Sequence, residues 1–252
     1  MSKRILSPYE QNQLRLHRVV DLELDSIGEK PVEYVTGHAQ FRHLDFIVNQ
    51  SVLIPRLETE KIIDLAKQFS FNTWQTDHQL TIADVGTGSG CLGISASLEL
   101  YRIGFHRQTA TLIDRSADAL KIAGLNAGRL LPKHLQPSLC QSDLLNNYQG
   151  PKIDLLLANL PYIPTFRIPK LAASVKDFEP ILALDGGTDG TLLINRLLDQ
   201  THSFLSSTFF AIFEIDHTHR LKDFHLQDDW ETELIKDFGN HTRFLTIKSH
   251  NI

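Results

Sequence analysis

The fold is decided by one stretch of sequence, LTIADVGTGSG at residues 80–90. Its first six residues are largely apolar and predict a buried strand, and Gly86, Gly88 and Gly90 predict a tight turn into a following helix. Glycines at a strand-to-helix turn let a ligand approach the backbone closely. The stretch therefore predicts the first strand, turn and helix of a cofactor-binding α/β domain. A glycine turn that binds nothing is the alternative.

Short apolar runs alternate with helical segments from residue 80 onward. Strands are predicted at residues 80–85, 110–114, 138–141, 153–158, 208–215, 232–237 and 244–248, and helices at residues 91–100, 117–130 and 191–205. Because this alternation is typical of parallel sheets, the sequence predicts an α/β, Rossmann-like sheet of seven strands, mostly parallel. The last two strands surround the turn Gly239-Asn240 and predict an antiparallel pair at the C-terminus.

The chain ahead of this domain has a different texture. Residues 1–30 predict a short helical N-terminal segment, and residues 31–79 predict a β-hairpin and a linker helix. The aromatic and β-branched run at 41–48 predicts the first strand of the hairpin, and its turn is expected at 49–51. The cofactor-binding domain is expected to cover residues 80–252.

Composition excludes several classes of protein. The 252 residues are 42% hydrophobic and 22% charged, as in soluble globular proteins, which excludes a disordered chain and a coiled coil. The net charge of −5 provides no global basic field for nucleic acid, so nucleic acid is not expected as the direct substrate. Cys91 and Cys140 lack disulfide or metal-type spacing, and no signal peptide or membrane-spanning run is present. We expect a cytoplasmic monomer with no metal and no membrane partner.

Three carboxylates follow or precede the ends of predicted strands. Asp84, just ahead of the glycines, is typical of S-adenosyl-L-methionine (AdoMet) loops, where it helps to place the amino-acid end of the cofactor. Asp114 follows the next strand, where a carboxylate can accept from both ribose hydroxyls of either NAD or AdoMet. Asp143 ends the third strand and can accept from an adenine amino group, with a helix N-cap or surface turn as the alternative. Because residues 88–93 also satisfy G-x-G-x-x-G, a dinucleotide site remains open here.

A tetrapeptide, Asn159-Leu160-Pro161-Tyr162, closes the buried strand at 153–158 and is expected to face the cofactor. An amide or aryl-amine nitrogen is a poor nucleophile because its lone pair is delocalised, so it needs two acceptors that hold its N–H groups. The Asn159 side-chain oxygen and the Leu160 carbonyl can be these acceptors, while Pro161 stiffens the turn and Tyr162 offers a stacking face. The tetrapeptide therefore predicts methyl transfer by positioning and electrostatics. A plain strand stop is the alternative.

The tetrapeptide matches the pattern (N/D/S)-(P/I/L)-P-(Y/F) of AdoMet-dependent amino-methyltransferases. Within them the chain resembles the peptide chain release factor N5-glutamine methyltransferases, from about residue 30 to the C-terminus. Four further stretches carry the resemblance: residues 31–37, 52–60, 178–180 and 183–190. The resemblance implies a class I methyltransferase fold, AdoMet as cofactor, and transfer of a methyl group to the side-chain amide nitrogen of a glutamine in a release factor.

The resemblance also implies roles for individual residues. Cofactor contacts are implied for Asp84, Gly86, Thr87, Gly88, Ser89, Gly90, Asp114, Asp143, Leu144 and Asn159. Residues 159–162 are implied to hold the glutamine amide, and Phe41 is implied to contact the substrate as well. Phe41, Arg56, Glu58 and Thr59 are implied to lie near the cleft, with a surface salt-bridged turn at residues 56–58 as the alternative.

Two departures from the family keep other functions open. Leu160 stands where the family usually has a proline, and this form of the tetrapeptide is similar to that of ribosomal-RNA adenine dimethyltransferases. Only about 30 residues precede Pro31, fewer than in the family's usual N-terminal domain. The alternatives are an adenine N6-methyltransferase acting on RNA or DNA, and a non-catalytic AdoMet-binding module associated with translation. An NAD-dependent dehydrogenase is a weaker alternative.

Overall fold

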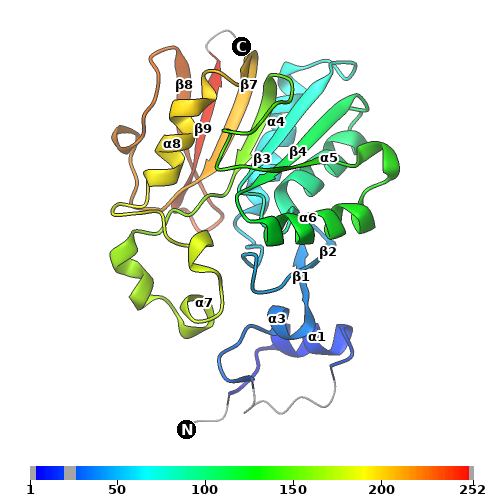
Figure 1. Ribbon diagram of the computed structural model, residues 1–252, viewed down its shortest axis with the longest axis vertical. Coiled ribbons are helices and arrows are strands. Elements are labelled where there is room, and N and C mark those ends of the chain that lie inside the picture. The colour runs from blue at the N-terminus through cyan, green and yellow to red at the C-terminus, as the bar shows by residue number, and fades with distance from the viewer. Residues whose placement is uncertain (1–3, 20–26, 250–252) are drawn as a thin grey trace.

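The computed structural model describes residues 4–19 and 27–249. Its main feature is a sheet of seven strands in the order β5-β4-β3-β6-β7-β9-β8 (Figure 1). The strands are β3 (Leu80–Val85), β4 (Gln108–Asp114), β5 (Ser138–Gln141), β6 (Ile153–Ala158), β7 (Leu205–Glu214), β8 (Trp230–Lys236) and β9 (Thr242–Ser249). The first five are parallel, and β9 is antiparallel to both β7 and β8. This confirms the predicted fold class.

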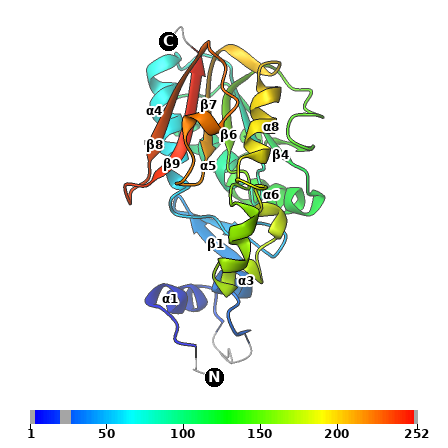
Figure 2. The same ribbon diagram turned by 90° about the vertical axis from the view of Figure 1, so that its left-hand side faces the viewer.

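Helices cover both faces of the sheet. They are α4 (Glu60–Thr73), α5 (Cys91–Arg102), α6 (Ala117–Leu130) and α8 (Leu192–Thr201). The first three share one hydrophobic cluster with one face of the sheet, and α8 shares a second cluster with the other face. Figure 2 shows α4 and α8 on opposite sides of the strands.

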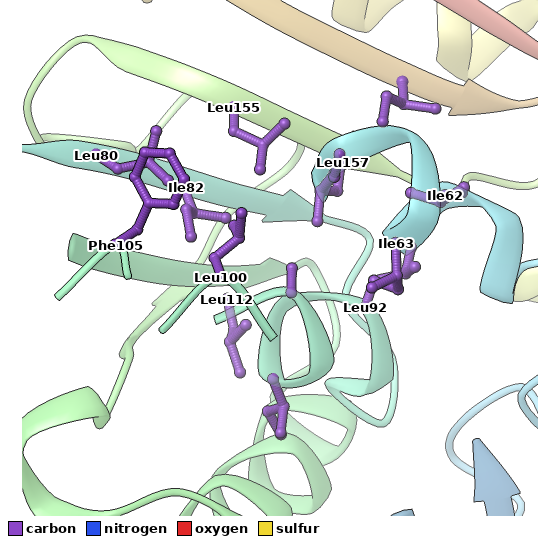
Figure 3. Close-up of a cluster of buried hydrophobic side chains, with 14 of the residues drawn as sticks. Ile62, Ile63, Leu80, Ile82, Leu92, Leu100, Phe105, Leu112, Leu155 and Leu157 are labelled. Atoms are coloured by element: carbon purple, nitrogen blue, oxygen red, sulfur yellow. The ribbon is translucent and has the colours of Figure 1, made fainter. Parts of the chain in front are cut away.

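The alternation of side chains along the central strands explains this layering. In β3 and β6 all side chains are buried, as expected for strands covered on both faces. Leu155 and Leu157 point toward α4 and α5 (Figure 3). Leu156 and Ala158 alternate with them and belong to the cluster under α8. The apolar run at residues 153–158, which the sequence predicts as a buried strand, therefore lies in the middle of the core.

The N-terminal part extends from the end of the sheet at which the glycine turn lies (Figure 1). It contains α1 (Pro8–Leu16), α3 (Val32–Thr36) and the antiparallel hairpin of β1 (His38–Phe41) and β2 (Leu44–Ile47). The helix predicted within residues 1–30 is α1, while residues 1–3 and 20–26 lie outside the described residues. No helix of the described residues is long and apolar enough to cross a membrane.

The hairpin is present, but the predicted position of its turn is wrong. The turn is Arg42-His43 rather than residues 49–51, and both residues have positive φ, 49° and 61°. Such a two-residue turn matches strand twist but is unfavourable without glycine or asparagine. Tertiary contacts offset the strain, because the Arg42 guanidinium binds Glu99 at 2.7 Å and Asp64 at 2.9 Å. These contacts cannot be read from the local sequence.

Candidate active site

A cavity of about 310 Å³ lies at the carboxyl ends of β3, β4 and β6. This is the edge of an open α/β sheet at which ligands bind. Ten of the residues predicted to contact the cofactor or the substrate line it: Gly86, Thr87, Gly88, Ser89, Asp114, Asp143, Leu144, Asn159, Leu160 and Pro161. Asp84, Gly90, Tyr162 and Phe41 do not line it.

Strand register brings the cavity walls together. In the parallel pairing, Val85 is opposite Ala158, so the glycine turn and Asn159 leave the sheet side by side. On the other side of β6, Ala158 is opposite Phe213, which places Asn159 next to Glu214 at the end of β7. Three segments distant in sequence therefore meet at one point.

The glycine turn provides a backbone cradle. Gly86 has a φ of 75°, which is unfavourable for other residues, and a Cβ there would lie 2.8 Å from Leu160 Cδ2, so the Leu160 side chain would have to move. Gly88, with a φ of 53°, has open space where a Cβ would be, and its N–H donates to Asp114 Oδ2 at 2.9 Å. The turn thus keeps one side free of side chains for a ligand.

Asp84 is buried beneath this turn rather than on the cavity wall. Its Oδ2 accepts from Thr87 Oγ1 at 2.6 Å and from the Gly93 N–H at 2.8 Å, which ties the turn to the start of α5. Its Oδ1 has no hydrogen-bond partner among the described residues. Burial raises the pKa of Asp84 to about 6. The carboxylate therefore holds the turn in place from beneath and does not form part of the cavity wall.

The carboxylates at the ends of β4 and β5 differ in environment. Asp114 accepts from the N–H groups of Gly88 and Ser116, and burial raises its pKa. It still faces the cavity, where a carboxylate can accept from ribose hydroxyls. Asp143 is about half exposed and pairs with Arg196 at 2.7 Å, and Leu144 beside it has a φ of 55°. Together the glycine cradle, the Asp114 carboxylate and the apolar Leu144 side chain on the cavity wall fit the parts of AdoMet.

Asn159 is held by a hydrogen-bond network. Its Nδ2 donates to Glu214 Oε2 at 3.0 Å and to Thr59 Oγ1 at 3.2 Å. The Thr59 hydroxyl donates to the same Glu214 oxygen at 2.6 Å, and the Tyr162 hydroxyl donates to Glu214 Oε1 at 2.9 Å. Asn159 Oδ1 has no hydrogen-bond partner among the described residues. The amide oxygen is therefore left as an acceptor on the cavity wall.

Residues near the cleft divide into two groups. Arg56 and Thr59 line the cavity, whereas Glu58 is exposed and does not. Phe41 is 1% exposed and packs edge-on against Phe46 in the main core. The substrate contact expected of Phe41 is therefore corrected, because its ring is enclosed by hydrophobic side chains.

Sequence reasoning missed Glu214 and Glu179. Glu214 is the last residue of β7, and Glu179 pairs with Arg56 at 2.6 Å. The available signal for Glu214 was a carboxylate near the end of the apolar strand predicted at residues 208–215. Nothing in the local sequence indicated which residue it would contact.

One group of three potential metal ligands occurs among the described residues, His17, His38 and Asp45 in the N-terminal part. The two imidazole rings are stacked, with centroids 4.2 Å apart and planes 14° from parallel. Lone pairs in nearly parallel ring planes do not converge on one ion, so this arrangement does not form a metal centre.

Comparisons with known proteins agree with this geometry. A family model described as "Methyltransferase small domain" matches residues 58–174. Three relatives are named "Release factor glutamine methyltransferase". That of Koribacter versatilis is 35% identical over 80% of this chain and 68% of its own, and that of Bacillus subtilis is 30% identical over 96% and 82%. The Moorella thermoacetica relative is 44% identical over an aligned region that covers 64% of this chain and 53% of the relative.

Solved structures support the fold. The hMettl16 catalytic domain has a TM-score of 0.58 and 12% identity, covering 81% of this chain and 74% of that one. A putative rRNA-methylase from Clostridium thermocellum has a TM-score of 0.51 and 11% identity, covering 78% and 100%. The fold and the site together define a class I methyltransferase whose cofactor is AdoMet. At the level of sequence, the chain belongs to the release factor glutamine methyltransferase family.

Proposed function

We propose that this protein transfers a methyl group from AdoMet to the side-chain amide nitrogen of a glutamine in a peptide chain release factor. One observation carries the proposal. The Nδ2 group of Asn159 donates two hydrogen bonds into the protein, to Glu214 and Thr59, and its Oδ1 has no partner among the described residues and lies at the cavity wall. A free amide oxygen beside the cofactor cavity is what an incoming NH₂ group requires.

The chemistry follows from the poor nucleophilicity of an amide nitrogen. When bound, AdoMet supplies an electrophilic methyl group on a positively charged sulfur. Asn159 Oδ1 and the Leu160 carbonyl each accept one N–H of the substrate amide, which leaves the nitrogen lone pair directed at the cavity. No described backbone N–H donates to the Leu160 carbonyl, so this acceptor is also available. The same acceptors would stabilise the positive charge that develops on the nitrogen as it takes the methyl group from the sulfur, and the methylated nitrogen would then release one N–H proton.

Apolar side chains form part of the cavity wall. Leu160 is 5% exposed and packs against Gly86, so replacing the family's usual proline fills the base of the turn with an apolar side chain. Pro180 and Leu182 form part of the opposite wall. An apolar enclosure of this kind strengthens the hydrogen bonds to the amide.

The surface around the cavity suits binding of a protein partner. Exposed apolar side chains lie next to residues of the cavity wall: Leu57 is 70% exposed, Ile181 59% and Leu182 48%. Such side chains are typical of protein-binding surfaces, and the net charge of −5 disfavours a nucleic-acid substrate. A monomeric state and a cytoplasmic location, where translation termination takes place, belong to the same proposal.

The test is direct. The purified protein is incubated with AdoMet and a release factor, and peptide mass spectrometry locates any added methyl group. We expect one methyl group on the side-chain amide of one glutamine. A methyl group on adenine of an RNA or DNA offered in parallel, or AdoMet binding without any methylation of the release factor, would contradict the proposal.

A further inference from the structure

Glu214 is the buried centre of the network behind Asn159. It is 1% exposed and accepts three hydrogen bonds, from Thr59, Asn159 and Tyr162, at 2.6, 3.0 and 2.9 Å. We propose that Glu214 is a positioning residue that fixes the orientation of the Asn159 amide. The inference rests on the proposed function, because it explains why Asn159 presents an acceptor to the substrate.

The orientation of this amide decides whether the site can work. With Nδ2 toward Glu214, Asn159 presents Oδ1 to the substrate NH₂ group. In the flipped orientation, Oδ1 would face the carboxylate and Nδ2 would face the substrate, so acceptor would meet acceptor and donor would meet donor. An ionised carboxylate only accepts, so ionised Glu214 permits one orientation alone. Burial raises the pKa of Glu214, and the hydrogen bonds from Thr59 and Tyr162 act against that rise by stabilising the ionised form.

A neutral side chain of the same shape would not discriminate between the two orientations. A glutamine at position 214 carries one oxygen and one NH₂ group, and either could face Asn159. The hydroxyls of Thr59 and Tyr162 rotate freely and both donate and accept, so they adapt to each arrangement. The negative charge itself therefore supplies the selectivity.

Burial of this carboxylate is otherwise unfavourable. No salt bridge to Glu214 occurs among the described residues; Arg243, the nearby cation, donates to Asp237 at 3.4 Å instead. A buried carboxylate without an ion-pair partner costs free energy even when hydrogen bonds satisfy it. A neutral residue would serve packing equally well, so the charge points to function rather than stability.

The experiment uses three variants of the full chain and the release-factor assay. Glu214→Gln removes the charge at constant shape. Asn159→Asp places two carboxylates against each other. In the double variant Asn159→Asp/Glu214→Gln, the NH₂ group of residue 214 donates to one oxygen at position 159, and the other oxygen faces the substrate. Asp154→Asn is the matched control, because Asp154 is also a buried acceptor, of the Thr81 N–H, at the opposite end of the sheet.

We expect Glu214→Gln to lower kcat about 10- to 100-fold, as misplacement of a catalytic group does, and to raise KM for the release factor because the flipped amide no longer accepts the substrate N–H. The AdoMet Kd should stay within about twofold of wild type. The kcat of Asn159→Asp should fall by at least the same factor. The double variant should be more active than either single variant, which a merely structural role for Glu214 would not produce. Circular dichroism and Tm establish that each variant is folded.

The outcomes separate the two claims. No glutamine methylation by the wild-type protein overturns the proposed function. Wild-type methylation with a kcat for Glu214→Gln equal to that of Asp154→Asn overturns the role of Glu214 alone. Loss in the double variant equal to the sum of the two single losses, on a free-energy scale, also overturns it.

Discussion

The guanidinium of Arg56 binds both carboxylate oxygens of Glu179 through one nitrogen, at 2.6 Å each. Arg56 follows the hairpin, and Glu179 belongs to the segment between β6 and α8. Both neighbouring segments line the cavity, through Pro55 on one side and Pro180 on the other. The ion pair therefore joins two walls that are more than a hundred residues apart in sequence, and Glu179 is almost fully buried in it.

Arg56→Ala should destabilise the protein in a pH-dependent way. Burial raises the pKa of Glu179, and Arg56 lowers it again, so loss of Arg56 leaves a buried carboxylate without a counter-charge. Breaking such a pair costs about 3 kcal/mol. The loss should be largest at alkaline pH and should shrink toward acid pH, where Glu179 takes up a proton and no longer needs the arginine.

Chemical denaturation of Arg56→Ala across this pH range measures the effect. Arg56→Ala/Glu179→Gln is the control, and it should recover most of the stability because no uncompensated charge remains. A loss independent of pH in the single variant would refute this account of the pair.

Gly86→Ala should abolish cofactor binding. The added Cβ would lie 2.8 Å from Leu160 Cδ2, and the φ of 75° is unfavourable for alanine by about 1 kcal/mol or more. The turn and Leu160 must then move apart, which deforms the cradle. Isothermal titration with AdoMet tests this. The matched control is Gly128→Ala, a glycine of α6 with nothing within 4 Å of its Cβ position, which should bind normally.

Asp84 should make the ligand-free protein less stable as pH rises from about 4 to about 7. Its pKa is 3.8 in the unfolded chain and about 6 in the folded one, so the folded state binds more protons between these values. Stability from this group is present below pH 3.8 and is lost as the pH passes 6. A difference of about two between the folded and unfolded pKa values corresponds to about 3 kcal/mol of folding free energy.

Asp84→Asn removes this titration. Relative to wild type, the variant should gain stability as pH rises through that range, and Tm scans at several pH values would show it. Asp199→Asn, at an exposed carboxylate remote from the turn, is the control. A constant difference in Tm between Asp84→Asn and wild type would show that Asp84 is not buried as described.

Asp114→Asn should weaken AdoMet binding. The side chain remains the same size, but one acceptor at the ribose position becomes a donor, and hydrogen bonds to a charged group contribute about 1.5–3 kcal/mol. An affinity loss of about 10- to 100-fold follows from that range. The thermal stabilisation of the protein by added AdoMet should fall in parallel. Unchanged affinity would exclude Asp114 from the ribose site.

Much of the architecture could be predicted because it depends on local patterns. The alternation of buried strands with helices, the glycine turn after β3 and the tetrapeptide after β6 are all properties of short segments. The hairpin turn could not be predicted, since Arg42 and His43 tolerate positive φ only through distant partners such as Glu99. Phe41 was misplaced for the same reason: an aromatic residue beside a turn packs either toward the core or toward a cleft.

By itself, the sequence predicted which backbone segments line the cavity and that Asn159 would be among the residues there. It could not predict that Glu214 would bind the Asn159 amide, or that Arg56 and Glu179 would join two walls of the cavity. Those pairings join residues 55 and 123 positions apart. Strand register and the packing of loops decide them, and both arise only when the whole chain has folded, because a side chain's hydrogen-bond partner is set by distance in space.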